Sequence, residues 1–170
     1  MRCDNGSELF PVVDPSGVVV GSATRGECHG GSMLLHPVVH LHLFNSRGEL
    51  YLQRRPVWKD IQPGRWDTAV GGHVDWGETV EEALRREVRE ELGITEFSPL
   101  RIAVYPFRSD RERELVYVHR AVYDGARIIY YRIQVQINTI YYLHINTYNY
   151  EKSNLHPKSF LSLCWGADQT

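Results

Sequence analysis

Cysteine is scarce in this chain, and no part of it is a long apolar run. The 170 residues include three cysteines, Cys3, Cys28 and Cys164, none of them in a C-x-x-C pair. An odd and scattered set argues against a disulfide framework or a zinc ribbon and favours a reducing compartment. No run approaches the ~18 apolar residues of a membrane span, and the first residues lead into no apolar signal segment. We therefore expect a cytoplasmic protein with no membrane partner.

An excess of positive charge is also lacking. The sequence holds 19 Lys and Arg against 21 Asp and Glu, a formal net charge of -2. Proteins that bind a phosphate backbone usually carry a basic excess, so nucleic acid is not an expected partner. The chain is 42% apolar and 24% charged, which is typical of one globular domain with a sizeable core. Composition leaves the oligomeric state open.

Strand and turn signals alternate along the first 125 residues, and one long helix interrupts them. Pro and Gly divide residues 10–20 into a short predicted hairpin. Further strands are expected at 36–44 and 49–55 around the turn 45–48, at 66–70 closed by Gly71-Gly72, and at 101–107 and 115–123. Thr79 with Glu82 forms a capping box, and Gly93 suits the left-handed end of a helix. The pattern predicts an α+β fold with a helix over 79–92.

This helix places carboxylates where a core is expected. At about 100° per residue, Glu87 and Glu91 fall within about 20° of Val80, inside the apolar stripe, and Glu90 lies on its edge. Buried ionised carboxylates cost several kcal/mol each unless a positive group meets them. Arginine can supply that charge, and so can a hard cation such as Mg²⁺ or Mn²⁺. The remaining charged residues take the solvent side: Glu81, Glu82, Arg85, Arg86 and Arg89.

The segment 72–94 reads GHVDWGETVEEALRREVREELGI. It resembles the Nudix box, G-x5-E-x7-R-E-U-x-E-E-x-G-U with U aliphatic, and every fixed position matches. The resemblance implies a Nudix fold, in which a mixed β-sheet is sandwiched between helices (α/β/α), and a divalent-metal-dependent hydrolase of small diphosphates such as nucleoside diphosphate derivatives. It implies Mg²⁺ or Mn²⁺ bound by Glu87, Glu90 and Glu91 with support from the Gly72 carbonyl and Glu78, acids oriented by Arg86, and Glu90 or Glu91 as general base.

Residues 9–123 also resemble the isopentenyl-diphosphate isomerase-like branch of the Nudix superfamily. The shared features include Asp14–Gly21, Leu41–Leu52, Pro63-Gly64 and Trp66. That likeness implies a second metal site made of three histidines and two acids, namely His29, His36, His73, Glu112 and Glu114. The isomerases carry a catalytic cysteine where this chain has Gly71, and glycine transfers no proton. The sequence therefore favours a hydrolase. An isomerase-like enzyme and a catalytically impaired diphosphate-binding protein are the alternatives.

Two basic residues, Arg54 and Arg55, end the predicted strand 49–55. They suit a substrate phosphate, although a solvated strand end explains them equally well.

Acidic residues nearly vanish after Gly125. Residues 126–170 contain two acids, Glu151 and Asp168, and six of the ten tyrosines. We therefore assign residues 1–125 to the Nudix domain and residues 126–170 to an atypical C-terminal segment. Alternating apolar residues over 133–146 predict an irregular β-hairpin that packs poorly. The alternative is a sequence unrelated to the usual ending of the family.

Overall fold

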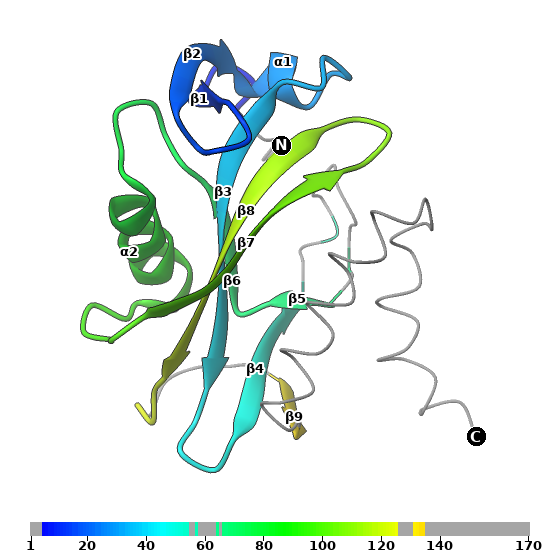
Figure 1. The fold of residues 1–170 in the computed structure, drawn as a ribbon. Helices are drawn as coiled ribbons and strands as arrows, with labels where there is room; N and C mark the ends of the chain where they lie inside the picture. The colour runs from blue at the N-terminus through cyan, green and yellow to red at the C-terminus, as the bar shows by residue number, and fades with distance from the viewer. Residues whose placement is uncertain (1–4, 55–56, 58–63, 65, 126–130, 135–170) are drawn as a thin grey trace. The chain divides into compact units, whose positions relative to one another are not determined.

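The computed structural model describes residues 5–54, 57, 64, 66–125 and 131–134. These residues form nine strands and two helices (Figure 1). Within the described ranges, neither helix is long and apolar enough to cross a bilayer. In chain order the elements are β1 (Leu9–Val13), β2 (Val19–Thr24), α1 (Arg25–Cys28), β3 (Leu35–Phe44), β4 (Glu49–Arg54), β5 (Trp66–Thr68), β6 (Val70–His73), α2 (Val80–Leu92), β7 (Leu100–Arg108), β8 (Arg113–Val122) and β9 (Tyr131–Gln134).

A small N-terminal unit consists of β1, β2 and α1. The two strands pair antiparallel across the turn at 14–18, as the Pro and Gly signals predicted. Helix α1 begins after Thr24, which forms a capping box with Glu27. Figure 1 shows this unit at the N-terminal end of β3. It therefore brings the end of α1 close to the start of the central strand.

The main sheet is mixed, with strand order β5-β4-β3-β8-β7, and β6 and β9 pair with β3 and β4. Its centre is the parallel pair β3 and β8, in register from Leu35 opposite Arg113 to Phe44 opposite Val122. The predicted antiparallel partners β3 and β4 meet across the turn at Asn45. Strand β6 pairs antiparallel with the first half of β3, including His40 with Gly71 and Val39 with Gly72. The α+β prediction is confirmed.

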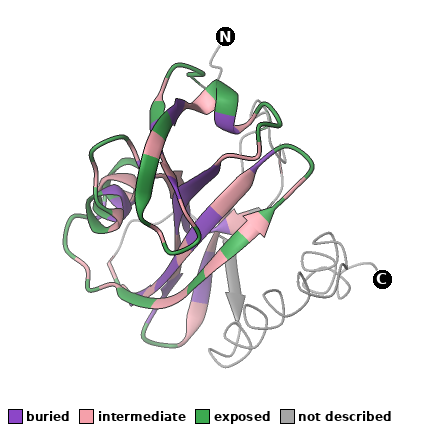
Figure 2. Ribbon diagram, turned by 45° about the horizontal axis from the view of Figure 1, so that its top comes forward, coloured by how far each residue is buried: buried purple, intermediate pink, exposed green. Residues whose placement is uncertain are grey.

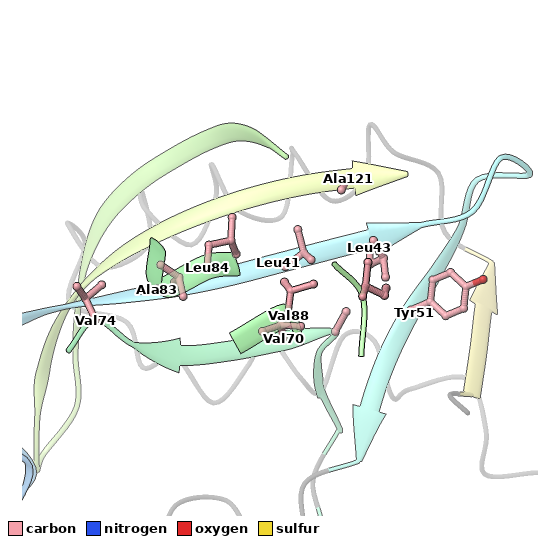
Figure 3. Packing of buried hydrophobic residues seen from close by; sticks show 12 residues of the cluster. Leu41, Leu43, Tyr51, Val70, Val74, Ala83, Leu84, Val88 and Ala121 are labelled. Atoms are coloured by element: carbon pink, nitrogen blue, oxygen red, sulfur yellow. The ribbon is translucent and has the colours of Figure 1, made fainter. Parts of the chain in front are cut away.

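Helix α2 covers one face of this sheet. Thr79 and Glu82 cap each other at its start, and Gly93 ends it with φ at 69°, so both predicted helix signals are confirmed. Ala83, Leu84 and Val88 are wholly buried. Figure 3 shows them against Leu41 and Leu43 of β3. Burying this apolar stripe fixes which side of α2 faces the sheet.

The strand predicted at 66–70 is two strands. Residues Trp66–Thr68 form β5 beside β4, and Val70–His73 form β6 beside β3. Gly71 and Gly72 lie inside β6, so the prediction that they close a strand was wrong. Turn propensity led to that prediction, but pairing with β3 and close packing against α2 determine the conformation here.

Side chains on the opposite face of the central strands are also buried, and Figure 2 shows that buried residues are concentrated in these strands. Val38, Val116 and Val118 form a cluster there with Phe107 and Tyr105 of β7. The sequence predicted only one core face for β3, whereas eight of its ten residues are buried. Strand β9 contains the start of the predicted C-terminal hairpin and pairs with β4. The rest of that hairpin, and any second helical layer, lies outside the described residues.

Candidate active site

The Glu87 side chain of α2 lies directly against β6 at Gly72, which has no side chain. A Cβ atom added at Gly72 would overlap the Glu87 carboxylate. Consecutive strand residues point to opposite faces, so Gly72 faces α2 and Gly71 faces away. Helix α2 therefore approaches β6 closely enough to hold the Glu87 side chain in place. That side chain is 14% exposed.

Arg86 joins the start of α2 to the loop before it. Its Nε donates to Glu78 Oε1 at 2.8 Å and its Nη2 to Glu78 Oε2 at 2.9 Å. Its Nη1 donates to Glu87 Oε1 at 2.8 Å, and Nη2 also donates to the His73 carbonyl at 3.0 Å. Hydrogen bonds from Arg86 hold the pKa of Glu78 below its usual range. These contacts fix the orientation of both carboxylates.

The helical projection placed Arg86 on the solvent side, and that prediction was wrong. Its side chain is only 20% exposed. A projection follows the Cα direction, whereas a long arginine side chain can lie back across the helix. Bidentate pairing with Glu78 draws it inward.

Glu91 stands one turn beyond Glu87. Gln53 of β4 donates to its Oε2 at 3.0 Å. Burial, followed by the charge of Glu87, raises the pKa of Glu91 to about 7. The residue as a whole is nevertheless exposed to solvent. Protein atoms therefore crowd the Glu91 carboxylate, while other parts of the residue stay accessible to solvent.

Glu90 differs from its two neighbours. Its side chain is 55% exposed, and its Oε2 lies 3.7 Å from Arg86 Nη1. The sequence predicted that three carboxylates crowd the buried face. The carboxylates of Glu87 and Glu91 are desolvated, whereas Glu90 is mostly exposed. The structure brings Glu78, Glu87, Glu90 and Gly72 around Arg86 and β6. Asp75 lies beside Arg86 and Gln53 binds Glu91, and neither of these two was predicted. Neither residue had a sequence signal, since each reaches the site only through the fold.

The charges of this group do not balance. Arg86 contacts Glu78 and Glu87 and lies within 3.6 and 3.7 Å of Asp75 and Glu90. One positive charge is thus shared among four acids, and Glu91 adds a fifth nearby. Desolvation, together with neighbouring acids, keeps the pKa of Glu87 raised despite its bond to Arg86. Oxygen donors with an excess of negative charge fit a hard divalent cation such as Mg²⁺ or Mn²⁺.

Arg54 and Arg55 were predicted to bind a substrate phosphate, and the structure describes only the backbone of Arg54. Arg54 ends β4 opposite Trp66. Arg55 lies outside the described residues. Their role stays a prediction.

Three histidines meet at the junction of the N-terminal unit and the sheet. His29 follows α1, His36 lies near the start of β3, and His73 ends β6. One ring nitrogen from each lies within 4.8 Å of the others. The Nε2 atoms of His29 and His73 are 3.0 Å apart. Two nitrogens bound tetrahedrally to one ion at about 2.1 Å lie roughly 3.4 Å apart, so a small adjustment accommodates a metal.

The surroundings of His36 also favour a metal site, in addition to the closeness of the three ring nitrogens. It is wholly buried, and burial holds its pKa below the usual range. Its Nδ1 lies 3.1 Å from the Leu34 carbonyl, whereas its buried Nε2 has no hydrogen-bond partner among the described residues. A neutral imidazole with one nitrogen held by a carbonyl and the other unsatisfied is the form that binds a metal.

The two predicted acids take different places. Glu112 is buried, and its Oε2 lies 2.9 Å from Nδ1 of His29, on the far side of the ring from His73. This is the position from which a carboxylate orients a ligating histidine. Glu114 is opposite His36 in the β3–β8 register. The structure therefore gathers the three histidines with Glu112 at their side, and Glu114 on the neighbouring strand.

Phe10 of β1 supports this cluster and was missed. Its ring stacks on His73 at 4.4 Å with 3° between the planes, and on His36 at 5.8 Å. The contact joins residues that are far apart in sequence, so no local pattern indicates it. A buried aromatic residue here holds the imidazoles in fixed planes.

Comparison with known families matches residues 34–130 of the chain to the NUDIX domain. The chain belongs to the Nudix family. The match covers more than half of the chain and includes α2, β6 and the loop between them. It begins within the loop before β3, so the N-terminal unit lies outside the matched range.

The curated relatives of this chain include both Nudix hydrolases and isopentenyl-diphosphate isomerases. An uncharacterized Nudix hydrolase of Nostoc sp. is 40% identical over 87 residues, which cover 51% of this chain and 52% of the relative. An isopentenyl-diphosphate Delta-isomerase of Mycolicibacterium vanbaalenii is 37% identical over 102 residues, or 60% of this chain and 56% of the relative. The chain thus spans about half the length of the curated relatives it matches.

Solved structures support the fold. The crystal structure of DR0079 from Deinococcus radiodurans superposes with a TM-score of 0.63 at 30% identity, covering 82% of this chain and 89% of that one. A MutT protein from Methanosarcina mazei gives 0.53 at 28% identity, with 62% and 80% covered. The Nudix fold predicted from the sequence is confirmed.

Proposed function

We propose that this Nudix protein is a divalent-metal-dependent hydrolase. Its reaction is the attack of water on the diphosphate linkage of a nucleoside diphosphate derivative or a similar small diphosphate. The observation that carries the proposal is the unbalanced acid group on α2, where Arg86 is shared among four carboxylates and Glu91 stands beside them. Family membership supports the same reaction class.

Each acid has a distinct part in this proposal. Glu87 and Glu91 hold the cation with Glu90 and the Gly72 carbonyl, while Glu78 and Arg86 keep Glu87 in position. When bound, Mg²⁺ or Mn²⁺ neutralises phosphate charge and makes a water more acidic. We assign the general base to Glu91 rather than Glu90, because Gln53 holds the Glu91 carboxylate by a hydrogen bond whereas the Glu90 side chain is 55% exposed.

Replacement of Glu91 tests the proposal. We expect Glu91→Gln to lower the rate of phosphate or nucleotide release by at least about 100-fold with Mg²⁺ or Mn²⁺, because it removes a charge from the cation site and a proton acceptor from the base. The substrates are a panel of nucleoside diphosphate derivatives and isoprenoid diphosphates. The thermal midpoint should not fall, because burial disfavours the charged carboxylate and the amide of Gln is of nearly the same size.

The matched control is Glu81→Gln, on the solvent side of the same helix, where Glu81 pairs only with Arg85 among the contacts seen. It should retain wild-type turnover. Full activity in Glu91→Gln would remove Glu91 from the site. Binding of diphosphates without any turnover by the wild-type protein would favour the impaired binding protein.

An isomerase is the second candidate, because curated relatives include isopentenyl-diphosphate isomerases. The isomerases carry a catalytic cysteine at the position of Gly71, and glycine supplies no thiol. A Cβ at this position would contact only His40 and Thr68 among its nearest neighbours. We therefore place hydrolysis first. Solvent deuterium entering an isoprenoid diphosphate without phosphate release would reverse this order.

We further propose that His29, His36 and His73 bind a second metal ion, with Glu112 orienting His29. Three imidazoles suit a first-row transition ion such as Zn²⁺ or Mn²⁺ better than Mg²⁺. The predicted roles of Arg54, Arg55 and Glu114, and a cytoplasmic location, stay predictions from the sequence.

A further inference from the structure

Glu91 is held differently from the other acids of the site. Within the described residues, the ion pairs of Arg86 reach four acids, and Glu91 is not one of them. The charges of Glu87 and Asp67 act on Glu91, and both are negative. Because Glu91 is an exposed residue, repulsion from these acids favours movement of its side chain into water. Its position against β6 therefore requires hydrogen-bond donors.

Two neutral donors hold the Glu91 carboxylate. Nε2 of Gln53 donates to Oε2 of Glu91 at 3.0 Å, and a backbone hydrogen bond joins Gly71 to the same carboxylate. Gln53 belongs to β4 and Gly71 to β6, so the acid is attached to two separate strands. An amide N–H orients a carboxylate without cancelling its charge, whereas a guanidinium would do both. The full negative charge of Glu91 thus remains available to a cation.

Gln53 reaches Glu91 because of the alternation of side chains along β4. Every second residue of a strand points to the same face, and Tyr51 packs in the core cluster that contains Val88 of α2 (Figure 3). Gln53, two residues after Tyr51, therefore faces α2 as well. The residue is half-buried, which restricts its rotamers and lowers the entropy lost in keeping the hydrogen bond. The amide of Gln53 is thus a fixed support for the acid.

We propose that Gln53 is a positioning residue of the reaction, which fixes the Glu91 carboxylate against β6 so that it faces the cation and the attacking water. The inference deepens the proposed hydrolase function and rests on it. Gln53 acts through Glu91 and touches neither the substrate nor the water. Removing the amide leaves the charge of Glu91 in place and releases its orientation, so the turnover rate falls while substrate binding is kept.

Steady-state kinetics on the substrate that the wild-type protein turns over test this inference. We expect Gln53→Leu to lower kcat about tenfold and to leave KM within about twofold of wild type, because one hydrogen bond that orients the base is lost. Gln53→His should recover most of the rate, since its Nε2–H reaches about as far as the glutamine amide. Gln53→Asn should not recover it, because its side chain is one methylene shorter.

A double-mutant cycle determines whether Gln53 acts through Glu91, and it requires no turnover. Mn²⁺ affinity is measured by electron paramagnetic resonance in the wild-type protein, in Gln53→Leu, in Glu91→Ala and in the double variant. Gln53→Leu should weaken Mn²⁺ binding about threefold in the wild-type background and should have no further effect in the Glu91→Ala background. A merely structural role of Gln53 would weaken Mn²⁺ binding equally in both backgrounds.

The control is Leu52→Val, on the opposite face of β4 and likewise half-buried, which should keep kcat and Mn²⁺ affinity within about twofold of wild type. A wild-type Mn²⁺ affinity in Gln53→Leu, or an equal loss in both backgrounds, overturns the inference whether or not the protein is a hydrolase. If the wild-type protein turns over no diphosphate, the hydrolase proposal fails, and the Mn²⁺ cycle alone decides whether Gln53 positions Glu91. If Gln53→Leu does not fold, Gln53→Asn replaces it in the cycle.

Discussion

At the scale of single residues, the site depends on where a side chain is missing. Gly72 has no Cβ, and the Glu87 carboxylate takes the space that one would fill. Arg86 then holds that carboxylate at 2.8 Å. The Glu87 carboxylate is thus held between two groups, the Gly72 backbone on one side and the Arg86 guanidinium on the other. Any side chain at position 72 would overlap the Glu87 side chain.

Gly72→Ala should therefore displace Glu87 rather than unfold the protein. The overlapping atoms are Cγ, Cδ and Oε1 of Glu87, which can move by side-chain rotation, so we expect a loss of about 1–3 kcal/mol in the free energy of unfolding. Mn²⁺ affinity should fall at least tenfold, because one ligand moves. Urea unfolding and Mn²⁺ titration followed by electron paramagnetic resonance measure the two effects.

Gly71→Ala provides the comparison for metal binding. Its Cβ meets only ordinary contacts and points away from α2, so Mn²⁺ affinity in the absence of substrate should stay at the wild-type level. Equal loss of Mn²⁺ affinity in both variants would show that β6 tolerates no side chain at all and that Glu87 is not the cause.

At the scale of secondary structure, the histidine cluster ties separate elements together. His29 belongs to the N-terminal unit, whereas His36 and His73 belong to the main sheet, and Glu112 lies in the turn between β7 and β8. Phe10 adds a stacked ring from β1. A metal here would connect the small unit to the sheet, so its binding energy would become stability of that junction.

Zn²⁺ in slight excess over the protein should raise the thermal midpoint by roughly 5–10 °C if it saturates the site. Amide exchange should slow in β1 and β2. In His36→Gln the increase should be lost, while His42→Gln should keep it. An equal increase in His36→Gln would place the zinc elsewhere.

Helix signals in the sequence were informative only when two of them coincided. Thr79 and Glu82 cap α2, and an apolar stripe follows them, so its bounds were predicted to within one residue. Thr24 and Glu27 form the same capping box on α1, yet the four-residue helix was missed because no apolar period accompanies it. The division of residues 66–73 into two strands was missed as well, since it depends on pairing with two different partners.

At the scale of the whole molecule, the sequence did not predict which strands pair when they are far apart in the chain. The ten-residue parallel register of β3 with β8 joins segments that are about 80 residues apart. Turn signals identify hairpins, whereas a parallel pair has no connecting turn to mark it. The acids on α2 could be predicted because one helix carries them. The approach of Phe10 to the histidines and of Gln53 to Glu91 could not, because each comes from another strand.

Amide exchange over the entire chain should follow this architecture. We expect the slowest exchange in β3 and β8, which have paired neighbours on both sides and buried side chains on both faces. The sequence predicts weak protection for residues 126–150. Strong protection throughout 126–150 would contradict the prediction of a poorly packed C-terminal segment.

The consecutive glycines of β6 also bear on how this protein can change during evolution. One of them faces the acids and leaves no room for variation, while its neighbour faces a separate space with room for a small side chain. Position 71 can therefore acquire a small side chain such as that of alanine, serine or cysteine on the face opposite the cation site. A fold with such an arrangement can keep its means of holding phosphates and exchange the chemistry performed beside them by a single codon.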